Sequence, residues 1–198
     1  GLKLGYQKID FEYGENNDFG TWYVEPKVNF TPNFILKGAF YSQDTDGVTA
    51  YDDVVYSDPK AWRAIFEVKQ EALNFTSLWL EYNKIDAGFV TPNSGAFNFI
   101  ANMNEYAPLY QNYTGGFKQI QSDTTIWRIG AHQKWSDKWD TFLHYAKFDI
   151  DAPVGFDYDA TNYTIGFNYH YTPAVTFSLA YDKLDSDILA FGDHVIHF

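Results

Sequence analysis

The sequence lacks several features that would place it in common functional classes. Its 198 residues include no cysteine and one methionine, which excludes disulfide bonds, cysteine-ligated metals and thiol catalysis. No apolar run approaches the roughly 18 residues that a membrane-spanning helix needs. Lys and Arg number 14 against 26 Asp and Glu, giving a net charge of −12, and nucleic-acid binding needs basic side chains. The chain is therefore either soluble or crosses a membrane as strands.

Catalytic and targeting motifs are also missing. The sequence contains no Gly-rich phosphate loop, nucleophile elbow or HExxH motif. Gln43–Gly47 (QDTDG) has the start of a calcium loop but not its downstream Glu. Nothing near Gly1 has the pattern of a signal peptide, which predicts a mature chain or an internal fragment if the protein is exported. We expect no enzyme, no cofactor and no metal.

Aromatic residues are abundant: Phe, Tyr and Trp make up 20% of the chain. Hydrophobic residues reach 45%, yet the mean hydropathy is −0.37, as expected where apolar and polar residues alternate. Membrane β-barrels place aromatic rings as girdles at both bilayer interfaces. Two such groups are predicted, one beside short turns and one near long loops: Phe30, Phe34, Trp135, Trp139, Tyr169 and Tyr171, and Tyr13, Trp22, Tyr82, Trp127 and Tyr163.

Alternation with a period of two residues recurs in segments of about ten residues, which predicts β-strands with one apolar and one polar face. The apolar parity in four of these segments contains Trp62, Ala64, Phe66 and Val68; Trp127, Ile129, Ala131 and Trp135; Tyr163, Ile165, Phe167, Tyr169 and Tyr171; and Val175, Phe177, Leu179 and Tyr181. The residues between them are mostly polar, small or charged.

The predicted strands form hairpins with short turns at one end and long loops at the other. The turns fall at 31–33, 74–76, 137–138 and 172–174, where Pro, Asn and Asp suit tight turns. The loops span about 14–20, 44–60, 86–123, 149–159 and 184–193. With a first strand at about 2–13 and a last one ending at Phe198, about ten strands result. This asymmetry is typical of outer-membrane barrels, and a soluble β-sandwich is the alternative fold.

The stretch from Lys60 to Phe89 (KAWRAIFEVKQEALNFTSLWLEYNKIDAGF) resembles the barrel of the S-layer-homology-domain porins of diderm Firmicutes, the OmpM-type proteins. The ending GDHVIHF, with the aromatic Phe198 last, is similar in kind. This resemblance implies an integral protein of the bacterial outer membrane, a homotrimer that gives passive diffusion of small hydrophilic solutes and ions. Family members also bind the cell wall through an N-terminal S-layer-homology domain, which this sequence lacks.

The fold class that follows is all-β: a single domain over residues 1–198, forming a transmembrane antiparallel up-and-down β-barrel. The family barrel has typically sixteen strands, so the chain is interpreted as the C-terminal part of a larger barrel, with a complete ten-stranded barrel as the competing interpretation. Two other functions stay open, a small closed barrel with a structural or adhesion role and an omptin-like rim protease. The protease would use Asp52, Asp53, Asp193 and His194.

If the apolar parity faces lipid, the other parity lines a water-filled lumen. Charged side chains of both signs would then set the field and the ion preference of the pore. The predicted pore-lining residues are Lys27, Lys37, Arg63, Lys69, Arg128, His132 and Lys134, together with Glu25, Glu67, Glu71, Glu81, Asp140, His144 and Asp182. The alternative is that these pairs brace a filled lumen.

Two loop features bear on the same function. The long, apolar segment 86–123 could enter the lumen as a constriction, pack at a trimer axis or cover the surface. The other long loops are acidic, with Asp groups in 44–58, 149–159 and 185–193. They either keep the rim soluble or concentrate cations at an entrance.

Overall fold

The computed structural model describes residues 1–9, 19–44, 58–91, 118–119, 122–151, 158–186 and 194–197. Within these ranges the strands are β1 (Leu2–Ile9), β2 (Phe19–Thr31), β3 (Phe34–Asp44), β4 (Lys60–Val68), β5 (Ser77–Ile85), β6 (Val90–Thr91), β7 (Lys118–Gln119), β8 (Asp123–Lys134), β9 (Trp139–Asp151), β10 (Tyr158–Thr172), β11 (Val175–Ser186) and β12 (His194–His197). The one helix, α1 (Gln70–Leu73), is a single turn.

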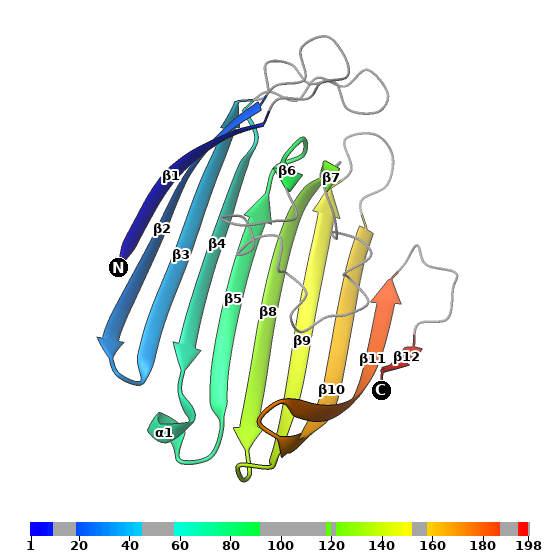
Figure 1. The fold of residues 1–198 in the computed structure, drawn as a ribbon. Helices are drawn as coiled ribbons and strands as arrows, with labels where there is room; N and C mark the ends of the chain where they lie inside the picture. Colours follow the sequence, from blue (N-terminus) through cyan, green and yellow to red (C-terminus); the bar gives the residue numbers. More distant parts are fainter. Residues whose placement is uncertain are drawn as a thin grey trace.

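The described strands form one ten-stranded antiparallel sheet in the order β1-β2-β3-β4-β5-β8-β9-β10-β11-β12 (Figure 1). Each inner strand therefore pairs with the sheet strand before it and the one after it along the chain, and the edge strands β1 and β12 pair with one neighbour each. The remaining two strands, β6 and β7, pair with each other. The all-β class, the up-and-down order and the number of strands predicted from the alternation are confirmed.

The short turns lie at one end of this sheet (Figure 1). Between β2 and β3 the turn is Pro32-Asn33, and between β10 and β11 it is Pro173-Ala174. At each, a threonine hydroxyl oxygen accepts a hydrogen bond from the backbone N–H two residues on, at 3.1 Å in Thr31–Asn33 and 3.3 Å in Thr172–Ala174. These are local side-chain turns of the kind that Thr favours. The turn between β8 and β9 covers residues 135–138.

The turn predicted at 74–76 is wrong. Strand β4 ends at Val68, the chain enters α1, and Asn74 closes the helical turn in the left-handed conformation, with φ of 54°. The sequence Gln-Glu-Ala-Leu consists of strong helix formers and contains no β-branched residue that would extend the strand. Asn is one of the few residues that ends helices in this conformation.

The other ends of the hairpins lead into the long connections, so the predicted sorting of short and long links is confirmed. The connections between β1 and β2, β3 and β4, β9 and β10, and β11 and β12 are largely outside the described residues, as is 92–117 between β6 and β7. The first strand is described over Leu2–Ile9, and the rest of its predicted range, 10–13, lies outside the described residues.

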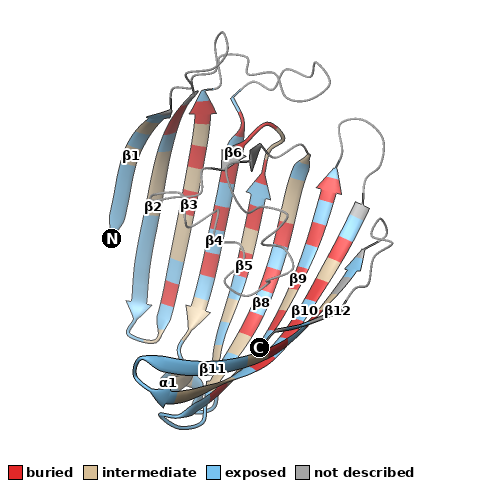
Figure 2. Cartoon of the chain, turned by 45° about the vertical axis from the view of Figure 1, so that its right-hand side comes forward, coloured by how far each residue is buried: buried red, intermediate tan, exposed pale blue. Residues whose placement is uncertain are grey.

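The two faces of the sheet differ in burial, as the alternating buried and exposed bands of Figure 2 show, and they also differ in chemistry. One face, here called the apolar face, carries large hydrophobic side chains that are exposed, among them Leu36, Trp62, Phe66, Leu80, Trp127, Ile129, Leu143, Ile165 and Phe177. The opposite or polar face carries buried polar and charged side chains, among them Gln43, Arg63, Glu81, Asn83, Arg128, Asp140, Asn162 and Asp182. It also carries a buried hydrophobic cluster, which includes Tyr41, Ile85, Ile126 and Phe148. A soluble sheet rarely leaves large apolar side chains exposed across one whole face.

The sheet is twisted and curled, but it is open in the described residues, where β1 and β12 form its two edges and do not pair with each other. Closure into a barrel therefore stays a prediction. The single helical turn in the described part of the chain is too short to span a membrane.

Candidate functional site

The polar face is the candidate site, because it gathers nearly all the charged residues that the sequence predicted to act together. Strand register places them on one side of the sheet: Lys27, Lys37, Arg63, Glu67, Glu81, Arg128, His132, Lys134, Asp140, His144 and Asp182. Lys69 and Glu71 are the exceptions. They lie in the α1 connection at the end of the sheet, since β4 ends before them, and their placement on a strand face is wrong.

A buried ionic triad occupies the middle of the polar face. Glu81 on β5 accepts a hydrogen bond from Nε of Arg63 on β4 at 2.9 Å, and its same carboxylate oxygen pairs with Nη2 of Arg128 on β8. The three side chains are 3%, 7% and 2% exposed, respectively. Strand register explains this arrangement. Arg128 is directly opposite Glu81, and Arg63 is opposite Asn83, which is the next residue after Glu81 on the same face of β5.

Two further contacts support the triad. The Asn83 amide donates to Glu81 at 2.7 Å, and the Arg128 guanidinium lies 5.8 Å from the centre of the Trp79 ring. Buried charges are tolerated only when they are paired and hydrogen-bonded, and the Glu81 carboxylate meets that condition with donors from three strands. The triad has a net charge of +1 and links β4, β5 and β8 side to side.

A row of aromatic rings continues across the polar face from the triad. The ring of Trp79 is 5.6 Å from that of His144 on β9, which in turn lies 5.1 Å from Phe142. Register places Gly130 of β8 between Trp79 and His144, and a Cβ atom built on this glycine would collide with the indole. The missing side chain of Gly130 therefore lets Trp79 lie flat against the sheet.

Other polar pairs extend to both sides. Lys37 of β3 pairs with Glu67 of β4. On β2, Glu25 accepts from the Tyr41 hydroxyl of β3 and pairs with Lys3 of β1 at 3.2 Å. Towards the other edge, the Thr164 hydroxyl of β10 donates to Asp182 of β11. Charged or hydrogen-bonding side chains thus line the polar face from β1 to β11.

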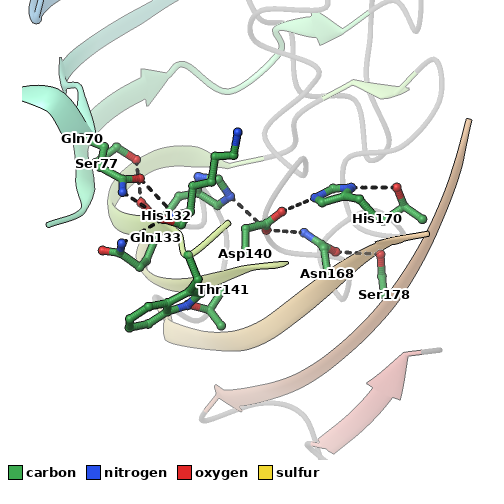
Figure 3. Close-up of polar contacts among 12 residues, drawn as sticks. Gln70, Ser77, His132, Gln133, Asp140, Thr141, Asn168, His170 and Ser178 are labelled. Atoms are coloured by element: carbon green, nitrogen blue, oxygen red, sulfur yellow. Dashed lines mark hydrogen bonds and ion pairs between the residues drawn. The ribbon is translucent and has the colours of Figure 1, made fainter. Parts of the chain in front are cut away.

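A second cluster lies at the short-turn end of the polar face, centred on Asp140 of β9 (Figure 3). Its Oδ1 atom is 2.9 Å from Nε2 of His132 on β8 and accepts from the Asn168 amide of β10 at 2.7 Å. Its Oδ2 atom pairs with Nε2 of His170, also on β10. The His132 and His170 side chains are 46% and 38% exposed, whereas Asp140 is 7% exposed. One buried carboxylate thus holds two accessible imidazoles.

Lys134 is directly opposite Asp140 in register but pairs with Asp137 in the turn, at 2.7 Å. The Lys134 ammonium holds the pKa of the Asp137 carboxyl below its ordinary value, first through this hydrogen bond and then through its charge. The Asp137 side chain is almost wholly in solvent, so screening keeps the pair weak.

The base of the long segment 86–123 turns onto the polar face. The Ala87 N–H donates to Asp123 Oδ1 at 2.7 Å, and the Phe89 N–H donates to the Asp86 carbonyl at 3.2 Å across Gly88, whose φ is 87°. Phe89 is fully buried and meets Tyr41 of β3 edge-on, with 6.4 Å between ring centres. The two ends of segment 86–123 therefore lie side by side, and the first of them turns onto the polar side of the sheet. Residues 92–117 lie outside the described residues.

Sequence reasoning missed two members of this face. It did not single out Tyr41 or Asn83, which hydrogen-bond to the charged groups. They share the parity of those groups, so alternation alone could have found them. The three histidines of this face lie in two places: His132 and His170 share Asp140, while His144 lies among aromatic rings.

No known protein family matches the sequence, and no curated protein is similar to it. Among the described residues, no three His, Cys, Asp or Glu side chains are placed to hold a metal ion. The geometry itself, a charged and hydrogen-bonded wall behind an exposed apolar face, is what a functional interpretation must explain.

Proposed function

We propose that this chain forms the β-barrel wall of a bacterial outer-membrane porin, through which small hydrophilic solutes and ions diffuse passively. The supporting observation is the inverted burial of the sheet. Arg63, Glu81 and Arg128 are nearly inaccessible, whereas Phe66, Trp127 and Phe167 are 40%, 49% and 38% exposed. Apolar surface on this scale is stable where it faces lipid, and the polar face then surrounds water.

Strand length agrees with this proposal. A tilted strand needs about 9–11 residues to cross a bilayer, and β2–β5 and β8–β11 run from 9 to 15 residues. At the two ends of the apolar face lie ring pairs such as Tyr82–Trp127 and Trp139–Tyr169, with centres 4.7 and 4.4 Å apart. Such rows are about eight residues apart on β8 and β10, roughly 26 Å along a strand at about 3.3 Å per residue. Barrel strands tilt by about 35–45°, so this length corresponds to roughly 20 Å along the membrane normal, against an apolar band of about 25 Å between aromatic girdles.

The soluble sandwich explains these observations less well. A sandwich buries one face of each sheet against a second sheet, and Phe66, Trp127 and Phe167 would then be covered. In the described residues no second layer covers the apolar face, whereas the opposite face buries the charged groups beside a hydrophobic cluster.

The family resemblance extends the proposal. The likeness of Lys60–Phe89 to the OmpM-type porins supports a homotrimer in the outer membrane, with contact to the cell wall through a domain outside this sequence. On the polar face, charges of both signs would create a field across the lumen, and with pore width this field sets ion preference. Open sheet edges do not occur in hydrocarbon, so in lipid both β1 and β12 need a neighbouring strand.

A narrow structural barrel is the second candidate, favoured by one observation. The Arg63–Glu81–Arg128 triad is satisfied within the wall itself, as expected if paired charges brace a filled lumen. A small barrel of about eight strands is just filled by side chains, so strand number decides between a braced and an open interior.

Conductance in a planar lipid bilayer tests the porin. The purified chain should give stable open steps, and an electrically silent barrel that inserts into the same membrane would favour the structural alternative. A charge reversal then tests which face lines the pore. Lys27→Glu on the polar face should increase cation preference, measured as the reversal potential in a KCl gradient.

Lys84→Glu is the matched control, because Lys84 is also exposed but has the parity of the apolar face on β5. It changes the net charge by the same amount and should leave the reversal potential unchanged. A larger effect from Lys84→Glu than from Lys27→Glu would contradict the assignment of the faces.

A further inference from the structure

We propose that the cluster of His132, Asp140 and His170 is a selectivity site, which turns the short-turn mouth of the pore from cation-favouring to anion-favouring as the pH falls. The inference rests on the proposed porin function and adds the ion class that passes and its dependence on pH. It starts from geometry: two accessible imidazoles on β8 and β10 flank one buried carboxylate on β9, all on the polar face (Figure 3).

The hydrogen bonding allows the cluster to change charge without rearranging. An ionised carboxylate only accepts hydrogen bonds, so Nε2 of each ring carries the hydrogen that faces Asp140. Protonation then occurs at Nδ1, away from the carboxylate. Nδ1 of His170 lies 3.0 Å from the Thr176 hydroxyl, which can donate to the neutral ring or accept from the charged one. The same contacts therefore hold both charge states.

The charge of the His132–Asp140–His170 cluster changes by two units when both histidines are protonated. Histidine is the side chain that changes charge between about pH 5 and 8, whereas an ordinary Asp titrates near 3.9. With both rings neutral the cluster carries −1, and with both protonated it carries +1. The exposed imidazoles face open space, so an ion passing this end of the sheet meets this charge directly.

Neighbouring groups on the described part of the polar face do not cancel the change. On β8 the nearest charge is Lys134, which pairs with Asp137. On β9, His144 lies further from the turn among aromatic rings, and on β11 Asp182 is beyond Ser178 and Thr176, which are uncharged. On β5 the facing residue is Ser77. At the end of the sheet, the Gln70 side chain of α1 hydrogen-bonds to the Lys134 backbone, and Glu71 lines the same hollow as Lys134 and Asp137. Carboxylates and ammonium groups do not ordinarily change charge between about pH 5 and 8, so the two histidines are the groups here whose type titrates in that range.

Reversal potentials of the purified chain in planar bilayers, in a KCl gradient at pH 8 and pH 5, test the inference. The cation-to-anion permeability ratio should fall several-fold between the two values. The double variant His132→Gln/His170→Gln keeps a side-chain amide to donate to Asp140 but cannot titrate, so its ratio should stay at the pH 8 value. Asp140→Asn should lower the ratio already at pH 8.

His144→Gln is the matched control, since it removes a histidine from the same face outside the cluster and should keep the pH-dependent fall. The inference is overturned if the wild type conducts with a ratio that does not change between pH 8 and 5, or if His144→Gln alone abolishes the fall. Absence of any conductance at pH 8 would instead refute the porin itself.

Nitrogen NMR of the histidine rings in detergent micelles gives a readout independent of conduction. The two rings share one carboxylate, so they should titrate as a coupled pair. Replacing His170 by Gln should move the titration midpoint of His132 and leave that of His144 in place. Independent titration of His132 and His170 would contradict the shared site.

Discussion

Glu81 is the residue on which the charges of the polar face depend most. Its carboxylate pairs with both Arg63 and Arg128, which are nearly inaccessible. Removing one partner from a buried ion pair typically costs about 3–5 kcal/mol, because the remaining charge stays buried. We therefore expect Glu81→Gln to lower the free energy of unfolding by roughly that amount, measured by urea titration of the protein folded in lipid vesicles.

Asp137→Asn is the control for this prediction. It also removes the acidic partner of a cation, Lys134, but both groups are in solvent. The depressed pKa of Asp137 means that the pair stabilises the fold above the pH at which the carboxyl ionises, and this contribution disappears on acidification. We expect no measurable change in the free energy of unfolding. Equal effects of the two variants would show that burial does not distinguish these ion pairs.

At the residue scale, alternation predicted which side chains share a face but not which ones touch. Arg63, Glu81 and Arg128 were placed on one face by parity, yet their pairing depends on the register of three strands. Register follows from turn lengths and packing, and one of the turns was assigned wrongly. The Asp140–His170 contact has the same origin, since the two residues lie 30 positions apart in the sequence.

At the scale of the element, the exposed side of each strand is the part that the proposed function places against hydrocarbon. Ile165 on β10 lies between the aromatic rows and is 57% exposed. An arginine near the bilayer midplane of a barrel costs about 2–4 kcal/mol, whereas an exposed substitution in water stays within about 0.5 kcal/mol. We expect Ile165→Arg to lower the unfolding free energy in vesicles by the larger amount.

Ala174→Arg provides the comparison, because Ala174 belongs to the exposed turn between β10 and β11. It introduces the same side chain nine positions further along the same hairpin, outside the apolar face, and should have little effect. If Ile165→Arg were as harmless as Ala174→Arg, the apolar face would have to contact water.

Elements were predicted well where the period was sustained and poorly where it stopped. The hairpins at Pro32 and Pro173 agree with the structure because proline and threonine determine the turn locally. In the sequence, the alternating pattern continues beyond Val68 through Lys69 and Glu71. The helix propensity of Gln70–Leu73 overrides this pattern in the structure, so Lys69 and Glu71 do not lie on a strand.

At the scale of the whole molecule, closure is the feature on which the sequence left two interpretations, part of a larger barrel or a complete ten-stranded one. Strand number and order followed from the pattern, but closure depends on contacts between the first and last strands, which no local pattern encodes. In lipid, unpaired backbone groups cost several kcal/mol each. We therefore expect the outward-facing amides of β1 to be protected from hydrogen exchange in vesicles, measured by mass spectrometry.

Two other segments of the same chain serve as references for the hydrogen exchange of β1. Central β5 is paired on both sides and should exchange slowly, while the turn at residues 135–138 should exchange quickly. Rapid exchange across β1 in the same sample would mean that this edge is open to water, which is incompatible with a barrel embedded in lipid.

Gly130 shows how an absent side chain can control an aperture. Trp79 lies flat over this glycine, and a single methyl group there would lift the indole off the sheet. Because the ring projects from the polar side, any larger residue at position 130 would move the indole away from the sheet on that side. If the sheet closes into the proposed pore, the residue at position 130 would then help to determine the width available to a solute.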